Sequence, residues 1–258
     1  MTATLHVERL GIRFGGLVAL EDVSFSVAPG SIHAVIGPNG AGKTTLINLI
    51  TGLYRPTSGR MLLDGAPLSG LASHRIAARG VARSFQNTEL FTELTARENV
   101  LAGLHRHLHY GLAETVLRLP RWRHAEREAA AQAEALLARV GLADQAEVAA
   151  GDLALGQQRR LELARALATG PRLLLLDEPA AGLRAAEAED LVRVLRDLRD
   201  TLGLAILLVD HVMRVVMQVS DRITVLHHGR LLADDLPEAI RRNPQVIAAY
   251  LGGAPHAA

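Results

Sequence analysis

Residues 37–44 read Gly37-Pro38-Asn39-Gly40-Ala41-Gly42-Lys43-Thr44 and match the pattern G-x-x-x-x-G-K-[ST]. The strand-like run His33–Ile36 precedes this segment, and a helical pattern from Thr45 to Ile50 follows it. The glycines let backbone N–H groups turn inward around phosphate oxygens, and the N-terminus of the helix adds a favourable dipole. Lys43 supplies a charge for the outer phosphates, and the hydroxyl of Thr44 suits Mg²⁺. The segment therefore predicts a phosphate-binding loop between a strand and a helix, with residues 37–45 contacting a nucleotide.

The composition is that of a globular protein. The chain has 258 residues, 49% hydrophobic and 21% charged, and its 28 basic and 27 acidic side chains nearly balance. These values exclude collagen-like and disordered chains and disfavour a generic nucleic-acid binder. The absence of Cys excludes disulfides, zinc fingers, Fe–S clusters and a Cys nucleophile. No apolar run approaches the roughly 18 residues that span a bilayer, and residues 1–16 lack a signal-peptide core, so we expect a soluble cytosolic protein.

Short apolar runs alternate with helical patterns, which is typical of an α/β fold. The continuously apolar runs 173–176 and 206–209 favour parallel strands that are buried on both faces. Strands are predicted at Leu5–Arg9, Ser24–Val27, Ser31–Ile36, Arg60–Leu63, Val81–Phe85, Leu173–Leu176, Ala205–Val209, Arg222–Leu226 and Arg230–Ala233.

Residues 94–156 carry almost no strand pattern. Thr95 and Glu98 have the spacing of a capping box, which predicts a helix from there to about Leu104. Further helices are predicted over Ala125–Val140, with Gly141 as the stop, and over 157–168. The sequence therefore predicts an all-helical insert that interrupts an α/β core.

A second chemical signal is the apolar run 173–176 followed by Asp177, Glu178 and Pro179. A strand that ends in acidic residues delivers carboxylates to the carboxyl edge of a sheet, where ligands bind. We expect Asp177 to hold Mg²⁺, directly or through water, and Glu178 to polarise an attacking water molecule.

A third signal lies before the helix 157–168, where the chain reads Leu153-Ala154-Leu155-Gly156-Gln157. The order of phosphate loop, Gln86, helical insert, L-x-x-G-Q, acidic strand and His211 resembles the ATP-binding cassette (ABC) family of transporter ATPases. The resemblance implies a P-loop NTPase (RecA-like) α/β core with an inserted all-helical signature subdomain. It implies one domain over residues 4–252, with the core at 4–93 and 157–252 and the helical subdomain at 94–156.

The resemblance also implies roles for individual residues. Phe14 corresponds to the aromatic residue that stacks on adenine, and Gln86 to the glutamine that reaches Mg²⁺ and the attacking water. His211 corresponds to the histidine that contacts the γ-phosphate. Residues 153–157 correspond to the motif that binds the γ-phosphate of ATP held by the other cassette of a dimer. The implied cofactors are ATP and Mg²⁺.

Finer matches, such as residues 84–87, 156–162, 177–183 and 243–252, resemble the ATPase subunits of branched-chain amino acid importers. Importers for urea or amides are similar, and a soluble ABC ATPase or a phosphate-loop kinase is a more distant alternative. The resemblance implies a Mg-dependent ATPase at the inner face of the cell membrane. Its partners would be integral-membrane permease subunits, which dock around residues 87–93, and indirectly a solute-binding protein. It would also pair with a second ATPase subunit, and a heterodimer is favoured over a homodimer. The basic segment around Trp122 is read as a solvated or membrane-facing surface, and no nucleic-acid partner is expected.

The chain departs from the family pattern in three places. Asp210 precedes His211 at a position where Glu or Thr is frequent. Ala154 stands where the motif L-S-x-G-Q has Ser, and Leu183 and Arg184 stand near the position of the usual Asp after Pro179. None of these changes removes Lys43 or the two acids, so we expect hydrolysis to survive while contacts across a dimer are weakened.

Overall fold

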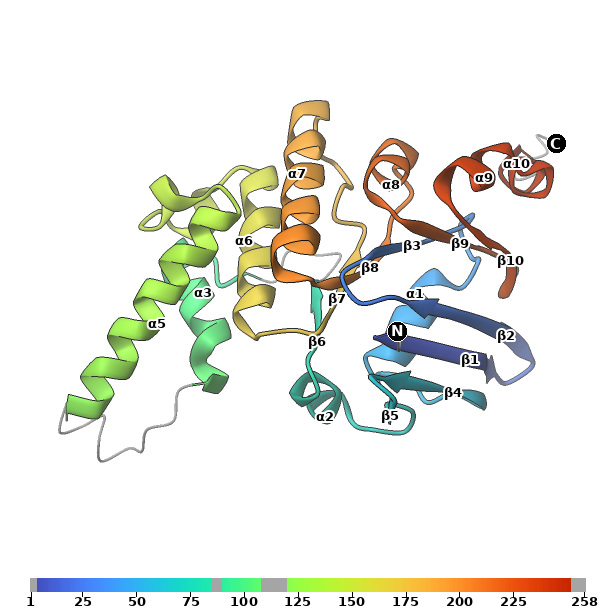
Figure 1. Cartoon of the computed structure of the whole chain (residues 1–258), viewed down its shortest axis with the longest axis horizontal. Helices are drawn as coiled ribbons and strands as arrows, with labels where there is room; N and C mark the ends of the chain where they lie inside the picture. Colours follow the sequence, from blue (N-terminus) through green and yellow to red (C-terminus); the bar gives the residue numbers. More distant parts are fainter. Residues whose placement is uncertain (1–3, 85–89, 108–119, 252–258) are drawn as a thin grey trace. The chain divides into compact units, whose positions relative to one another are not determined.

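The computed structural model describes residues 4–84, 90–107 and 120–251, and these form two compact units. The first unit combines residues up to Arg83 with those from Arg172 onward, and the second covers residues 84–171. Figure 1 shows both units, coloured along the sequence. The domain limits given above stay a prediction.

Two sheets form the first unit. The smaller sheet has the order β2-β1-β4-β5, and its strands pair antiparallel. The larger sheet has the order β10-β9-β3-β8-β7-β6, in which β9, β3, β8 and β7 are parallel and β10 pairs antiparallel with β9. The strands are β1 (Leu5–Phe14), β2 (Leu17–Val27), β3 (Ile32–Ile36), β4 (Ser58–Leu63), β5 (Ala66–Pro67), β6 (Val81–Ser84), β7 (Leu173–Asp177), β8 (Ala205–Val209), β9 (Arg222–His227) and β10 (Arg230–Asp235).

The helices of the first unit cover both faces of the larger sheet. They are α1 (Lys43–Ile50), α2 (Ser73–Ala78), α7 (Ala185–Leu202), α8 (Met213–Val219), α9 (Pro237–Arg242) and α10 (Pro244–Leu251). Helices α7, α8 and α9 lie on one face, and α1 lies on the other face, between the two sheets (Figure 1).

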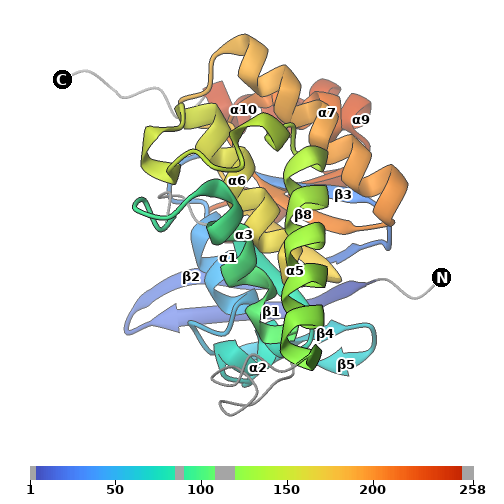
Figure 2. The same cartoon turned by 90° about the vertical axis from the view of Figure 1, so that its left-hand side faces the viewer.

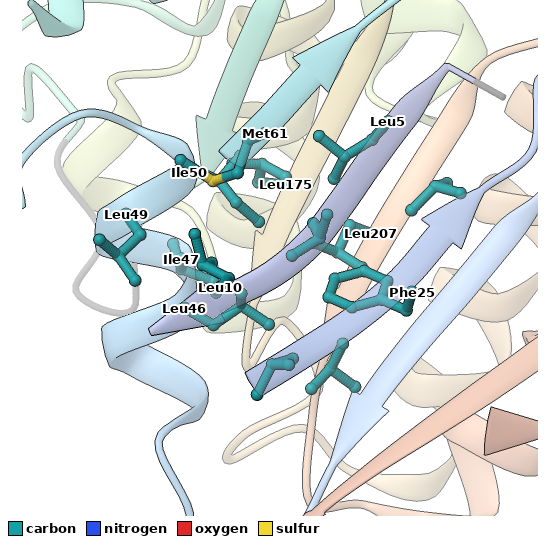
Figure 3. Packing of buried hydrophobic residues seen from close by; sticks show 14 of the residues in the cluster. Leu5, Leu10, Phe25, Leu46, Ile47, Leu49, Ile50, Met61, Leu175 and Leu207 are labelled. Atoms are coloured by element: carbon teal, nitrogen blue, oxygen red, sulfur yellow. The ribbon is translucent and has the colours of Figure 1, made fainter. Parts of the chain in front are cut away.

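One apolar cluster joins α1 to both sheets. Leu46 and Ile50 of α1 are fully buried together with Leu10 of the smaller sheet and Leu175 and Leu207 of the larger one (Figure 3). Burial of such side chains contributes about 1.5–3 kcal/mol each. This cluster fixes α1, and with it the loop that precedes α1, against the ends of the central strands.

The second unit is helical in its described part. Its helices are α3 (Ala96–Leu104), α5 (Pro120–Arg139) and α6 (Leu155–Ala168), with short 3-10 turns η1 (His105–His107), η2 (Ala143–Gln145) and η3 (Ala150–Asp152). Helix α3 packs against α5 and α6 (Figure 2). The predicted capping box is confirmed, because Glu98 N donates to Thr95 Oγ1 at 3.2 Å and Thr95 N donates to Glu98 Oε2 at 2.8 Å.

The predicted strands all occur, although several limits differ. Strands β1 and β2 are longer than expected and form a hairpin whose turn, Gly15-Gly16, interrupts the apolar pattern. The described part of α5 already starts at Pro120, earlier than the predicted start at Ala125. Helix α6 begins at Leu155, which brings the end of the L-x-x-G-Q segment into its first turn. None of the helices in the three described ranges is both long enough and apolar enough to cross a membrane.

Candidate functional site

The predicted phosphate-binding loop connects β3 to α1 and turns on two glycines. Gly37 has a φ of 155°, and a Cβ there would lie 2.2 Å from the carbonyl oxygen of Leu226. Gly42 has a φ of 102° and is the N-cap of α1, and a Cβ there would lie 2.5 Å from Leu20 Cδ2. A side chain at either position would therefore strain the backbone and collide with a neighbour. The two glycines therefore allow a backbone conformation in which the N–H groups of the loop can face an anion.

Lys43, the first residue of α1, reaches back over the loop. Its Nζ donates to the carbonyl oxygens of Gly37 at 2.7 Å and Pro38 at 3.1 Å. Burial lowers the pKa of Lys43, and the nearby carboxylates of Glu178 and Asp177 oppose that shift. The ammonium group predicted to face phosphate therefore lies within electrostatic reach of both acids at the end of β7.

A cavity of 420 Å³ opens beside the loop, within the size range of small-molecule sites. Residues 39–45 line it together with Glu178, residues 17–19 of β2 and the turn His228-Gly229. Residues 17–19 and the turn His228-Gly229 were not among the predicted site residues. Both turn residues have positive φ, 48° and 75°, and a two-residue turn ending in glycine between apolar runs is a readable hairpin signal.

Asp177 ends β7 and is almost fully buried, with 3% of its surface exposed. The guanidinium of Arg83, from β6, donates through Nη2 to Asp177 Oδ2 at 2.8 Å and through Nη1 to Asn48 Oδ1 at 2.9 Å. Burial raises the pKa of Asp177, and the hydrogen bond and charge of Arg83 oppose the shift. No local sequence pattern indicates Arg83 as part of the site, because it is 94 residues away from its partner.

Glu178 and His211 lie close together although they follow different strands. His211 Nδ1 is 3.5 Å from Glu178 Oε1, and both side chains are partly accessible, at 56% and 24% exposed respectively. Glu178 has a φ of 51°, and its N–H donates to the carbonyl oxygen of Val209 at 2.7 Å. A non-glycine residue in the left-handed region is uncommon and is often found at functional sites. The two predicted catalytic groups are therefore adjacent in space.

Phe14 is placed differently from the other candidates. Its ring makes an edge-to-face contact with Tyr54, with 5.2 Å between ring centroids, and 44% of its surface is exposed. Phe14 is not among the described residues that line the cavity, whereas Leu17, its partner across the hairpin, is. Its proposed contact with a base stays a prediction.

The L-x-x-G-Q segment belongs to the second unit and forms the start of α6. Ala154 is the N-cap of this helix and makes no side-chain hydrogen bond. The Gln157 side chain reaches back instead, and its Oε1 accepts the N–H of Ala154 at 2.9 Å. Leu153 and Gly156 are buried, whereas Leu155 is 43% exposed. The segment therefore forms the N-terminus and first turn of α6, and the N-cap residue of this helix has no hydroxyl group.

Two predicted features are not tested by this geometry. Gln86 lies outside the described residues, as do the first residues of the expected docking surface at 87–93. Within the described part of the chain, there is no group of three or more His, Cys, Asp or Glu side chains that could hold a metal ion.

Comparison with protein families gives two matches. The model described as ABC transporter matches residues 20–181, which include the loop, the L-x-x-G-Q segment and the acidic strand. The model described as branched-chain amino acid ATP-binding cassette transporter matches residues 230–256.

Individual proteins resemble the chain over almost its whole length. The high-affinity branched-chain amino acid transport ATP-binding protein BraF of Pseudomonas aeruginosa is 49% identical over 97% of this chain and 98% of its own length. LivG of Escherichia coli K12, with the same description, is 47% identical over the same shares. The crystal structure of MJ1267, an ATP-binding cassette of an ABC transporter in its ADP conformation, superposes with a TM-score of 0.85 at 29% identity, covering 98% of this chain and 100% of that one.

Proposed function

Because the chain belongs to the ABC transporter family, we propose that it is the subunit that hydrolyses ATP to power a branched-chain amino acid importer. The substrate class follows from the C-terminal match at residues 230–256 and from BraF and LivG, which are described as branched-chain amino acid transport proteins. An importer of urea or amides is the alternative within the same family.

The observation that carries the proposal is the cavity lined by both the phosphate-binding loop and Glu178. A triphosphate seated on the loop is bound by backbone N–H groups and by Lys43. Glu178 then accepts a proton from the attacking water as a general base. His211, 3.5 Å away, both orients that carboxylate and contacts the γ-phosphate. Phe14 contributes a face for the base.

Magnesium fits the oxygen atoms available here. Mg²⁺ prefers one or two protein oxygen ligands plus substrate phosphates, rather than a cage built only from protein side chains. The hydroxyl of Thr44 and the carboxylate of Asp177 are such ligands, and Gln86 is a further candidate. The ion would neutralise charge that develops on the β- and γ-phosphates.

We further propose that two cassettes close face to face, so that residues 153–157 of one meet the γ-phosphate on the other. Ala154 cannot donate a hydroxyl hydrogen bond, which to a charged group contributes about 1.5–3 kcal/mol. The first turn of α6 still offers backbone N–H groups and its dipole. A different second cassette that retains the Ser would give one stronger site, which favours a heterodimer. Permease subunits dock around residues 87–93 and hold the complex at the inner face of the membrane.

The test has two parts. The tagged protein is purified from native membranes in mild detergent, and co-purifying proteins are identified by mass spectrometry. Two polytopic subunits and a second, distinct cassette support the proposal, whereas ribosomes or DNA contradict it. Self-pairs alone after cross-linking contradict the heterodimer.

Uptake of labelled leucine and of labelled urea is then compared in cells that carry the wild-type chain or Lys43→Ala. Loss of leucine uptake alone supports the branched-chain substrate. Loss of urea uptake alone supports the alternative, and unchanged uptake of both contradicts both importers.

A further inference from the structure

Asp210 is a buried acid that the proposed reaction does not use directly. It directly follows β8, and none of its surface is exposed. Its Oδ2 accepts the N–H of Ala180 at 3.0 Å, and its Oδ1 accepts the N–H of Val212 at 2.8 Å. A buried carboxylate is costly unless its oxygens are hydrogen-bonded, and hydrogen bonds to an ionised group are short and directional. One side chain therefore ties two loops together.

Those two loops are the ones that carry the proposed catalytic groups. Ala180 lies two residues after Glu178, and Val212 directly follows His211. The parallel pairing of β7 with β8 runs up to Asp177 opposite Val209, and the N–H of Glu178 still donates to the carbonyl oxygen of Val209. Beyond that point the strands end, and the hydrogen bond from Ala180 N–H to Asp210 continues the connection between the two segments that follow them.

The geometry points to Asp210 as a positioning residue. We propose that its two hydrogen bonds set the main chain after Glu178 and after His211, and thereby hold Glu178 and His211 in their mutual position. The catalytic importance of this arrangement rests on the proposed function, in which both side chains face the same phosphate. The two hydrogen bonds of Asp210 are present in the structure whether or not the proposed function is correct. Asp210 touches neither nucleotide nor water in this scheme, so it acts only through its two neighbours.

Asp210→Asn is the sharpest substitution because it keeps the size of the side chain. The amide has one acceptor oxygen and one NH₂ group, so one of the two backbone N–H groups would face a donor instead of an acceptor. Asp210→Glu keeps both acceptor oxygens and is the second variant if the amide does not fold. Asp221→Asn is the control away from the site, at an exposed aspartate that also pairs with Arg199. Asp221 Oδ2 also accepts a backbone N–H, that of Ile32 at 2.8 Å, at the opposite end of β3 from the loop.

The first measurement needs no hydrolysis. The full-length protein is labelled with ¹⁵N-histidine, and the ring signals of His211 are assigned by their loss in His211→Ala. We expect the His211 signals to move in Asp210→Asn and to stay in place in Asp221→Asn. Unchanged His211 signals in Asp210→Asn overturn the proposal whether or not the wild type hydrolyses ATP.

The second measurement is ATP turnover. We expect Asp210→Asn to lower kcat at least ~10-fold, while the Kd for ADP changes less than about twofold because the loop and Lys43 are not altered. Asp210→Glu should retain more turnover than Asp210→Asn. In a His211→Ala background the Asp210→Asn effect on turnover should be smaller, because the part that acts through His211 is already lost and only the part through Glu178 remains. A full, additive loss in that background would mean that Asp210 does not act through His211. Absence of wild-type turnover would count against the proposed function alone, since the histidine signals test the positioning separately.

Discussion

The ion pair between Arg83 and Asp177 should be costly to break, because both side chains are largely buried. The side chains are 12% and 3% exposed, and Nη2 lies 2.8 Å from Oδ2. Removing one partner of such a pair leaves a buried charge without its counter-charge, which costs about 3–5 kcal/mol. We expect Arg83→Met to lower the free energy of unfolding by about 3 kcal/mol at neutral pH. This corresponds to a fall in Tm of about 6–12 °C for a chain of this length.

The matched control is a second Arg–Asp pair in the same unit. Arg172 Nη1 lies 2.9 Å from Asp64 Oδ2, but these side chains are 67% and 40% exposed. Exposed pairs contribute about 0–1 kcal/mol, so Arg172→Met should lower Tm by no more than about 4 °C. Both variants are compared by thermal unfolding without nucleotide. Equal losses in the two variants would contradict the argument, because burial is the property that separates them.

The pH dependence provides an independent check. In Arg83→Met the burial that raises the pKa of Asp177 remains, while the hydrogen bond and charge that lower it are gone. The folded variant then takes up a proton at a higher pH than the unfolded chain does, so it regains stability as the pH falls. The gap in Tm between variant and wild type should narrow as the pH falls from neutral toward the ordinary pKa of an Asp carboxyl. A gap that is constant over this interval would mean that the lost contact is not electrostatic.

Three further outcomes are expected. Glu178→Gln should keep ATP affinity and lower turnover by at least ~10²-fold, the size of a general-base effect, and near-normal turnover would refute the assignment. Phe14→Ala should weaken nucleotide binding, measured by titration, by about 1–3 kcal/mol if stacking resembles that on nucleic-acid bases, and an unchanged Kd in the folded variant would reduce Phe14 to a packing residue. Burial lowers the pKa of His33 to about 4, so as the pH falls the imidazole is protonated in the unfolded chain before it is protonated in the folded one. The free energy of unfolding should therefore fall by up to about 3 kcal/mol between about pH 6.5 and about pH 4. Urea unfolding should show that loss in the wild type and in the half-buried control His6→Gln, and a loss of the same size in His33→Gln would assign it to other groups.

The parts of the site that could be predicted are those encoded over short distances in the sequence. The loop from Gly37 to Thr44 is one continuous segment whose glycines, lysine and hydroxyl have fixed spacing. The acids at the end of β7 follow directly from an apolar run. Helix α7 was equally readable, because its buried residues Leu191, Leu195 and Leu198 have helical spacing, yet the sequence analysis assigned no helix there.

The parts that could not be predicted depend on pairings between distant segments. Arg83 reads as an ordinary charged residue in a strand until β6 joins the sheet beside β7. The lining provided by residues 17–19 requires the β1–β2 hairpin to be longer than its broken apolar pattern suggests. In both cases the decisive contact is created by sheet order, which no local pattern specifies.

Arg83 and Asp210 also show that apolar packing and buried hydrogen bonds have different roles around the site. Apolar burial around α1 is strong but non-directional, so it fixes where the loop lies without fixing how individual side chains point (Figure 3). Hydrogen bonds to a buried carboxylate are directional, and here they occur at the last residue of β7 and at the residue directly after β8, where the regular ladder ends. Substitutions in the apolar cluster should therefore lower stability with little change in the remaining chemistry. Substitutions at the buried charges should alter the relative positions of Asp177, Glu178 and His211 even in variants that still fold.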